Sequence, residues 1–340
     1  MATGAVQAGV TSGTGERAGG GAWLRRFAWA VVVYNVLVIV WGAVVRATGS
    51  GAGCGDHWPL CNGQVVPLNP RVATMIEFTH RIMSGGTLVL IVALVVWVFR
   101  ETVERHLART FAVAGLLLTL NEAVLGALLV KLGLTATSTS PLRPPMLALH
   151  LSNTLLLLGA LALTAHFLGR RATVVRGAVR LEHRFPALTG LLAAMAIGVT
   201  GSLAALGDTL FPSTSLRSAL AADFSSSAEW LVRLRILHPA SAVVAGAFIL
   251  WLLWRAVFVS RDGERPDGSI RRLGLWLAGL LGFQFLLGGL DVLLRAPVWM
   301  QVLHLAGADA FWCVLVVLTA TVTVIAMERP HPSGLREQDS

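Results

Sequence analysis

The sequence has 340 residues, of which 55% are hydrophobic and only 13% are charged. A soluble globular domain carries roughly 25% charged residues, so this composition excludes a soluble single-domain protein. The formal net charge is +9, but the basic residues lie between apolar runs instead of forming one soluble patch, which excludes a nucleic-acid partner. Three cysteines exclude a disulfide scaffold and leave room for one local bridge.

Apolar runs of about 20 residues recur along the chain, and one helix needs that length to cross a hydrocarbon core of about 30 Å. The eight runs span residues 27–46, 72–99, 108–131, 145–168, 186–206, 236–258, 272–294 and 300–326. They predict an all-α integral membrane protein with eight transmembrane helices. The first 22 residues are rich in Gly, Ala, Thr and Ser and are expected to form a disordered tail.

Cys54 and Cys61 lie in the Gly- and Pro-containing segment between the first and second runs. On the oxidising side of a membrane, such a pair is expected to form a disulfide. Two roles stay open for this bridge. It is either a structural staple of the loop, or a redox-active pair that exchanges with a partner.

In the second run, Glu77 precedes His80 by three residues, which puts both side chains on one face of a helix. Glu77 can act as an interfacial anchor, as a hydrogen-bond partner of His80, or as an acid or base beside a bound substrate. The same position before His238, in the sixth run, is Arg235. We interpret Glu77 as catalytic, with a structural role as the alternative.

Four of the nine histidines lie in the second, fourth, sixth and eighth runs: His80, His150, His238 and His304. Each lies within about three turns of the start of its helix, and even-numbered runs all start on the same side, so the four imidazoles share one depth. An ionisable residue inside a membrane indicates a functional site. Two facing imidazoles in a helix bundle are suitable axial ligands for haem iron. The sequence therefore predicts two haem sites, one per half.

Short patterns repeat between the two halves of the chain. Thr48-Gly49-Ser50 recurs as Thr200-Gly201-Ser202, and Leu149-His150-Leu151 recurs as Leu303-His304-Leu305. Four helices per half preserve the direction of insertion, so the halves are expected to be parallel, pseudo-symmetric four-helix bundles. The predicted units are a tail (1–22), a first bundle (23–170), a linker (171–184), a second bundle (185–327) and a C-terminal tail (328–340).

The distribution of basic residues predicts the orientation. With the N-terminus inside, 18 of the 27 Lys and Arg residues lie in inner segments and 8 in outer segments. Because basic loops are retained in the cytoplasm, both termini are predicted to be cytoplasmic, in a multi-pass protein of the cell membrane. Candidates for pairing with haem propionates are the arginines near the outer face: Arg46, Arg71, Arg81, Arg143, Arg217, Arg233, Arg235 and Arg295.

Taken together, these features resemble the haem A synthase family. The resemblance covers roughly residues 25–327 and depends on the two four-helix halves, one histidine in each even run, Glu77-Phe78-Thr79-His80-Arg81, and the preceding cysteine pair. Members of that family oxidise the C8 methyl group of haem O to a formyl group by successive hydroxylations, and the product is haem A for terminal cytochrome oxidase. Some members carry a second cysteine pair in the outer loop of the second half, and residues 207–233 contain none.

The resemblance implies a role for each candidate residue. His80 and His150 correspond to the substrate haem O site, His238 and His304 to a resident haem b, and Glu77 to the catalytic glutamate. Molecular oxygen and an external electron donor are implied as co-reactants. The implied partners are the lipid bilayer, a haem O synthase and cytochrome oxidase assembly factors, and a homo-oligomer is compatible with the sequence.

Two other classes of protein share part of this pattern. A dihaem b-type subunit that oxidises quinol would also need the histidine pairs, but it gives no reason for Glu77 or for the cysteine loop. A repeat-built transporter would need broken helices near the midplane, and the runs that contain the histidines lack a central Gly-Pro break. Analysis of bound haems separates the three hypotheses.

Overall fold

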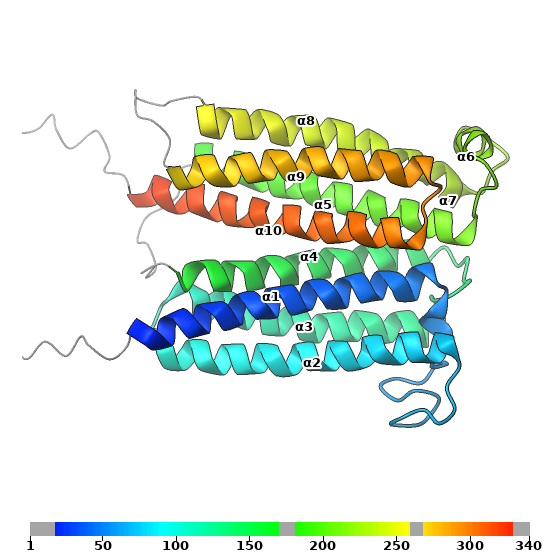
Figure 1. Ribbon diagram of the computed structural model, residues 1–340, viewed down its shortest axis with the longest axis horizontal. Coiled ribbons are helices and arrows are strands. Elements are labelled where there is room, and N and C mark those ends of the chain that lie inside the picture. The colour runs from blue at the N-terminus through cyan, green and yellow to red at the C-terminus, as the bar shows by residue number, and fades with distance from the viewer. Residues whose placement is uncertain (1–17, 170–180, 259–267, 329–340) are drawn as a thin grey trace, which may run out of the picture.

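The computed structural model describes residues 18–169, 181–258 and 268–328 (Figure 1). Within these ranges the chain is helical and contains no strand. The helices are α1 (Ala18–Ala47), η1 (Ser50–Ala52), α2 (Val72–Glu101), α3 (Leu107–Lys131), α4 (Arg143–Phe167), α5 (Leu181–Leu210), α6 (Leu216–Asp223), α7 (Trp230–Arg233), η2 (Leu234–Ile236), α8 (Leu237–Phe258), α9 (Gly268–Leu293) and α10 (Val298–Glu328).

All eight predicted spans are confirmed as helices long and apolar enough to cross a membrane. The sixth span is built from α7, η2 and α8, which together cover Trp230–Arg255. Large apolar side chains face outward along these helices; Val89 and Val244, for example, are 68% and 73% exposed. A continuous apolar exterior of this kind is stable only in lipid, so the chain is an all-α integral membrane protein.

Two helices begin inside segments that were expected to be a tail or a linker. α1 begins at Ala18, inside the segment expected to be a disordered tail. The buried side chains of Leu24 and Ala28 anchor this helix in the core, and such packing outweighs the low helix propensity of the preceding glycines. α5 begins at Leu181, inside the expected linker. The rest of the expected linker and tails (1–17, 170–180 and 329–340) lies outside the described residues.

The helices form two groups that run side by side, α1–α4 in one and α5 with α7–α10 in the other (Figure 1). α4 and α10 lie at the boundary, where half of each span is buried, against a third or less for the other spans. The Trp312 indole of α10 donates to the Leu155 carbonyl of α4 at 2.7 Å, and Gly159 leaves room for that indole. The grouping agrees with two four-helix halves, whose pseudo-symmetry stays a prediction.

The helix starts that carry the predicted histidines lie together at one end of the molecule, and both described chain ends lie at the other (Figure 1). The loop before α2 and the short helix α6 cover the first of these ends. α6 was not predicted. It begins with a capping box between Ser215 and Ser218, and Arg235 holds it by an ion pair with Asp223 at 2.8 Å.

Candidate functional site

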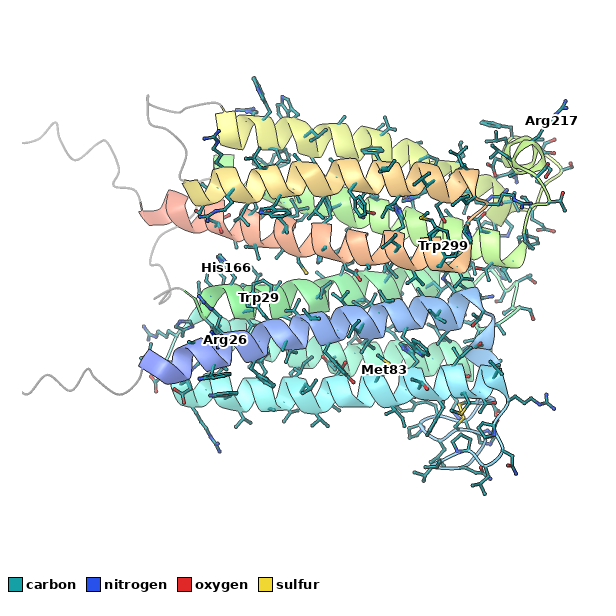
Figure 2. The ribbon with its side chains drawn as sticks, in the orientation of Figure 1. Arg26, Trp29, Met83, His166, Arg217 and Trp299 are labelled. Atoms are coloured by element: carbon teal, nitrogen blue, oxygen red, sulfur yellow. A yellow bond between two sulfur atoms is a disulfide. The ribbon has the colours of Figure 1, made fainter. Side chains whose placement is uncertain are left out.

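The four predicted histidines lie six to eight residues beyond the first residue of their spans. At 1.5 Å per residue they lie about 9–12 Å inside the loop-covered end. Figure 2 labels Met83, one helical turn beyond His80, on the same side of the middle of α2 as the loop. His80, His150, His238 and His304 therefore lie at similar distances from the loop-covered ends of their spans, and their common depth in the membrane stays a prediction.

In the first half, a glycine of the preceding helix faces each histidine. A Cβ atom built on Gly42 of α1 would lie 3.0 Å from Cε1 of His80, and one on Gly126 of α3 would lie 3.9 Å from Cε1 of His150. The missing side chains let the imidazoles lie against the backbone of the neighbouring helix.

The second half repeats this arrangement. Built Cβ atoms would lie 2.9 Å from Cε1 of His238 at Gly201 of α5, and 3.4 Å from Cε1 of His304 at Gly288 of α9. These four glycines were not predicted as neighbours of the histidines. The repeated Thr-Gly-Ser pattern, which includes Gly201, was the one sequence feature that pointed to any of these four glycines.

The rings of His238 and His304 face each other across the second half. Their centroids are 6.2 Å apart and their planes cross at 80°. One metal ion between two imidazole nitrogens, at about 2.0–2.1 Å from each, fits this separation. Two neutral nitrogen donors across an apolar bundle are also the donor set that a haem iron accepts, so the residues present fit a bis-histidine haem.

The nitrogen environments of the first-half histidines differ. The Nδ1 atoms of His80 and His150 are both buried and have no hydrogen-bond partner. His150 Nδ1 lies 3.4 Å from Glu122 Oε1 on α3. Glu122 was not singled out as a site residue from the sequence, because its approach to His150 depends on how α3 and α4 are rotated against each other.

Glu77 does not turn toward His80. Its carboxylate accepts two contacts from Arg81, the shorter at 2.5 Å, and one from the backbone N–H of Cys54 at 2.8 Å. The side chain of Glu77 is 5% exposed. Glu77 therefore joins α2 to the preceding loop, in the manner of the anchor role left open above.

The predicted disulfide between Cys54 and Cys61 is confirmed. Its loop packs closely on the start of α2, because a Cβ atom on Gly53 would lie 2.5 Å from the backbone of Ala73. Arg81 adds contacts to the loop carbonyls of His57 at 2.6 Å and Leu60 at 2.7 Å. The disulfide loop, residues 50–70, is thus fixed above the His80 end of α2.

Several of the candidate propionate arginines donate to protein groups in this structure. They are Arg46, Arg81, Arg143, Arg235 and Arg295. Arg46 of α1 reaches into the other half, where it binds the Ala205 carbonyl at 2.7 Å, Thr209 Oγ1 at 2.8 Å and Gln301 Oε1 at 2.8 Å. The propionate contacts stay predictions.

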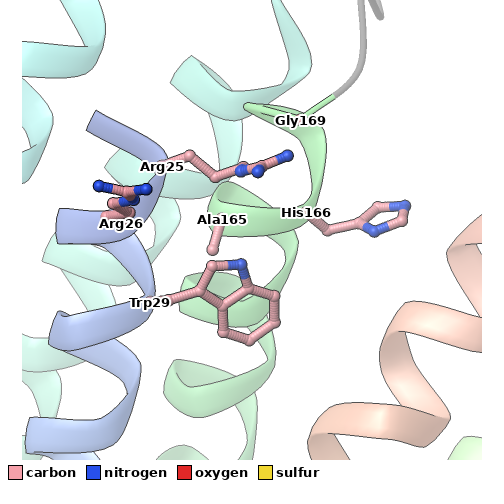
Figure 3. A pocket seen from close by; sticks show the side chains of 6 residues that line it. All are labelled: Arg25, Arg26, Trp29, Ala165, His166 and Gly169. Atoms are coloured by element: carbon pink, nitrogen blue, oxygen red, sulfur yellow. The ribbon is translucent and has the colours of Figure 1, made fainter. Parts of the chain in front are cut away.

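A cavity of about 470 Å³ lies at the opposite end of the molecule, between α1 and α4. Figure 3 shows its lining residues: Arg25, Arg26, Trp29, Ala165, His166 and Gly169. His166 points from α4 toward α10 (Figure 3), where its ring lies 3.4 Å from Thr321. Figure 2 places Arg26 and Trp29 far from Arg217 and Trp299 at the loop-covered end, so this cavity is separate from the histidine sites.

These features define a class: an all-α, multi-pass membrane protein with a histidine pair in each half near the loop-covered end. The family model described as cytochrome oxidase assembly protein matches residues 25–316. The chain belongs to this family, as the resemblance to haem A synthases predicted.

The curated relatives match different shares of the chain. A protoheme IX farnesyltransferase from Thermus thermophilus is 44% identical over 313 residues, which are 91% of this chain and 49% of that protein. Haem A synthases from Exiguobacterium sp. and Alkalihalophilus pseudofirmus are both 40% identical, over 31% and 29% of this chain and 35% and 33% of their own lengths. The chain therefore spans about half the length of the first of these relatives.

Proposed function

We propose that the protein is a haem A synthase, which oxidises the C8 methyl group of haem O to a formyl group with molecular oxygen and an external electron donor. The observation that supports this most directly is the set of four glycine-backed histidines near the loop-covered end, two in each half. Membership of the cytochrome oxidase assembly family and the relatives named haem A synthase give the reaction class.

In this proposal the two halves bind different haems and have different roles. His80 and His150 bind the substrate haem O, and His238 and His304 bind a resident haem b. The disulfide loop and Glu77 lie over the first half, whereas α6 and the Arg235 ion pairs lie over the second. When bound, haem b supplies one-electron transfer between the donor and the substrate site.

In this proposal the chain itself positions the imidazole rings, supplies the Glu77 carboxylate and excludes water from the reacting methyl group. Each glycine lets an imidazole approach the neighbouring helix, which fixes the plane of its ring. The disulfide loop covers the end of α2 above His80, and the apolar helices keep water from the reacting methyl group. Glu77 pairs with Arg81 at the loop-covered end of α2, and in this proposal its carboxylate is the acid or base of the reaction.

The orientation and partners follow from the same proposal. Both termini lie in the cytoplasm, and the histidine sites lie in the outer half of the cell membrane. A haem O synthase delivers the substrate, and oxidase assembly factors receive the product. The proposed bundles are residues 23–170 and 185–327, with the substrate site in the first.

The test is expression of the full chain with a haem O supply in a host that lacks haem A, followed by acid extraction and mass analysis of the haems. Appearance of the formyl product supports the proposal. Unchanged haem O with haem b still bound, although donor and oxygen are present, contradicts it and favours the dihaem electron-transfer subunit. A farnesylated product from protohaem and farnesyl diphosphate, the reaction named for the Thermus relative, would assign the chain to that reaction instead.

A further inference from the structure

We propose that Glu122 is a positioning residue for His150: its carboxylate accepts the Nδ1 proton of the imidazole, and so presents Nε2 to the iron of the bound haem. This inference rests on the proposed role of His150 as an axial ligand. It assigns a function to a carboxylate of α3 that the proposed reaction does not use. The argument depends on how the carboxylate is held, on what it faces, and on how the other three histidines differ.

The orientation of Glu122 is set by Asn153 of α4. The Asn153 Oδ1 accepts from Asn121 Nδ2 at 2.8 Å, and its Nδ2 donates to the Leu118 carbonyl at 2.9 Å. A carbonyl can only accept, so the nitrogen of Asn153 must face this side and also donates to Glu122 Oε2. Asn153 is 5% exposed, which makes this network part of the helix interface.

Thr154, the next residue, holds the other carboxylate oxygen. Its hydroxyl lies against both Glu122 Oε1 and the His150 carbonyl, the latter at 2.9 Å, and has one proton to donate between them. Asn153 and Thr154 of α4 therefore contact the two oxygens of Glu122, and polar donors at both oxygens favour a charged carboxylate. His150 lies four residues before Thr154 on the same face of α4. Oε1 also lies 3.4 Å from His150 Nδ1, which has no hydrogen-bond partner in this structure.

The other three imidazoles have different partners. Among the described residues, His150 is the one member of the four with a carboxylate oxygen within 4.0 Å. His238 Nδ1 lies 3.4 Å from the neutral hydroxyl of Thr200, and the neutral amide of Gln284 lies 3.1 Å from His304 Nδ1. The Nδ1 atoms of His80 and His150 both lack a hydrogen-bond partner, but His150 has a carboxylate oxygen at ion-pair distance. The two rings of the first half therefore differ in whether a carboxylate lies beside Nδ1.

A carboxylate behind a metal-bound imidazole fixes its tautomer and raises its basicity as a ligand. A more basic ligand stabilises ferric over ferrous iron, so Glu122 lowers the reduction potential of the haem held by His150. It also makes His150 the firmly held ligand of the first half. His80 is then the ligand that can be released on the side covered by the disulfide loop.

The experiment is an anaerobic redox titration of the full chain purified with haem O and haem b bound, in the wild type and in Glu122→Gln. Glutamine keeps the size of the side chain and removes its charge. We expect one of the two one-electron steps to shift toward ferrous iron by about tenfold or more, which is about 59 mV per tenfold, while the other step stays in place. A shift below twofold in both steps, at full haem content, overturns the inference.

Three further variants keep the test decisive. Glu122→Asp retains the charge and is expected to stay within about threefold of the wild type. Asn153→Ala removes a holder of Glu122 without touching His150, and should shift the same step in the same direction by a smaller factor. Thr200→Val, the matched change beside His238, should leave that step unchanged. Loss of haem from Glu122→Gln that Glu122→Asp restores also supports the inference, whereas equal loss in all variants overturns it.

The same preparation separates this inference from the proposed function. Wild-type protein that binds both haems but yields no formyl product contradicts haem A synthesis, while the Glu122 comparison still decides the role of the carboxylate. Normal formyl product with unshifted steps in Glu122→Gln contradicts the inference alone.

Discussion

At the scale of single residues, each candidate histidine ligand lies against a glycine of a neighbouring helix, which has no Cβ atom. A glycine leaves about one methyl group of space between two helices, and the imidazole fills that space. The approach is closest at Gly201, where an added Cβ atom would lie 2.9 Å from His238 Cε1. Any side chain at this position must move the ring.

We therefore expect Gly201→Ala to lower the haem content of the second half severalfold. Alanine is favoured over glycine in a helix by about 1 kcal/mol, so loss of haem would not reflect a weaker α5. Gly279→Ala on α9 is the matched control, because a Cβ atom there meets nothing within 4 Å. Haem per polypeptide, measured by pyridine haemochrome on purified protein, decides the matter. Equal haem in both variants would show that the close approach has no role in binding.

Glu77 gives the second prediction at this scale. Glu77→Gln is expected to leave haem binding intact and to reduce conversion of haem O by about 10² or more, because a positioned acid or base typically contributes 10²–10⁴. Asp56→Asn, in the same loop, changes an 83% exposed carboxylate and should convert haem O normally. Mass analysis of extracted haems measures the product. Normal haem A output from Glu77→Gln would show that Glu77 has only a structural role, through its contacts with Arg81 and Cys54.

At the scale of elements, the disulfide loop has two independent attachments. One is the covalent bridge between Cys54 and Cys61. The other is the set of contacts with α2, in which Thr74 donates to the Gly53 carbonyl at 2.8 Å and Arg81 and Glu77 hold further backbone groups. The bridge therefore shapes the loop, and α2 holds it in place.

This division predicts the result of removing the bridge. A bridge of this kind typically contributes 2–4 kcal/mol by restricting the open chain, so Cys54→Ser with Cys61→Ser should expose the loop to local opening. Hydrogen exchange over residues 50–70 should rise by about tenfold or more, while exchange in α4 stays unchanged. Turnover separates the two roles left open for the pair. Unchanged conversion indicates a staple, and lost conversion with the loop still protected indicates redox exchange.

Elements were predictable from the sequence to different degrees. The eight spans were predicted because an apolar run of about 20 residues has few stable environments besides a bilayer, and the depth of the four histidines followed from helical rise. α6 was missed because eight residues with a Ser cap carry little periodic signal. The approach of Glu122 to His150 and of Gly42 to His80 depends on helix rotation, which a helix apolar on all sides does not specify.

At the scale of the whole molecule, the two halves meet through α4, α10 and one polar bridge. Arg46 of α1 donates to Ala205 and Thr209 of α5 and to Gln301 of α10, across the boundary between the groups. In a bilayer there is little hydrophobic gain from helix association, so packing and hydrogen bonds carry it. The bridge therefore contributes to holding the first half against the second.

We expect Arg46→Met to lower the free energy of unfolding by about 2–4 kcal/mol, because hydrogen bonds to charged groups contribute about 1.5–3 kcal/mol each and the partners would be left unpaired. Arg295→Met is the matched control, since Arg295 is exposed and donates to the Thr214 carbonyl. Thermal unfolding of both variants in the same detergent measures the difference. Equal midpoints would mean that α4 and α10 alone join the halves.

Orientation in the membrane is the last property of the whole molecule, and the arginine distribution predicts it. The described chain ends lie at the same end of the bundle, and the disulfide loop lies at the other (Figure 1). Because basic loops are retained inside, a C-terminal green fluorescent protein fusion should fluoresce and a C-terminal alkaline phosphatase fusion should be inactive. After mild reduction of intact cells, a membrane-impermeant maleimide should label Cys54 and Cys61. An active phosphatase fusion together with unlabelled cysteines would reverse the orientation, and would place the four histidines in the inner half of the membrane.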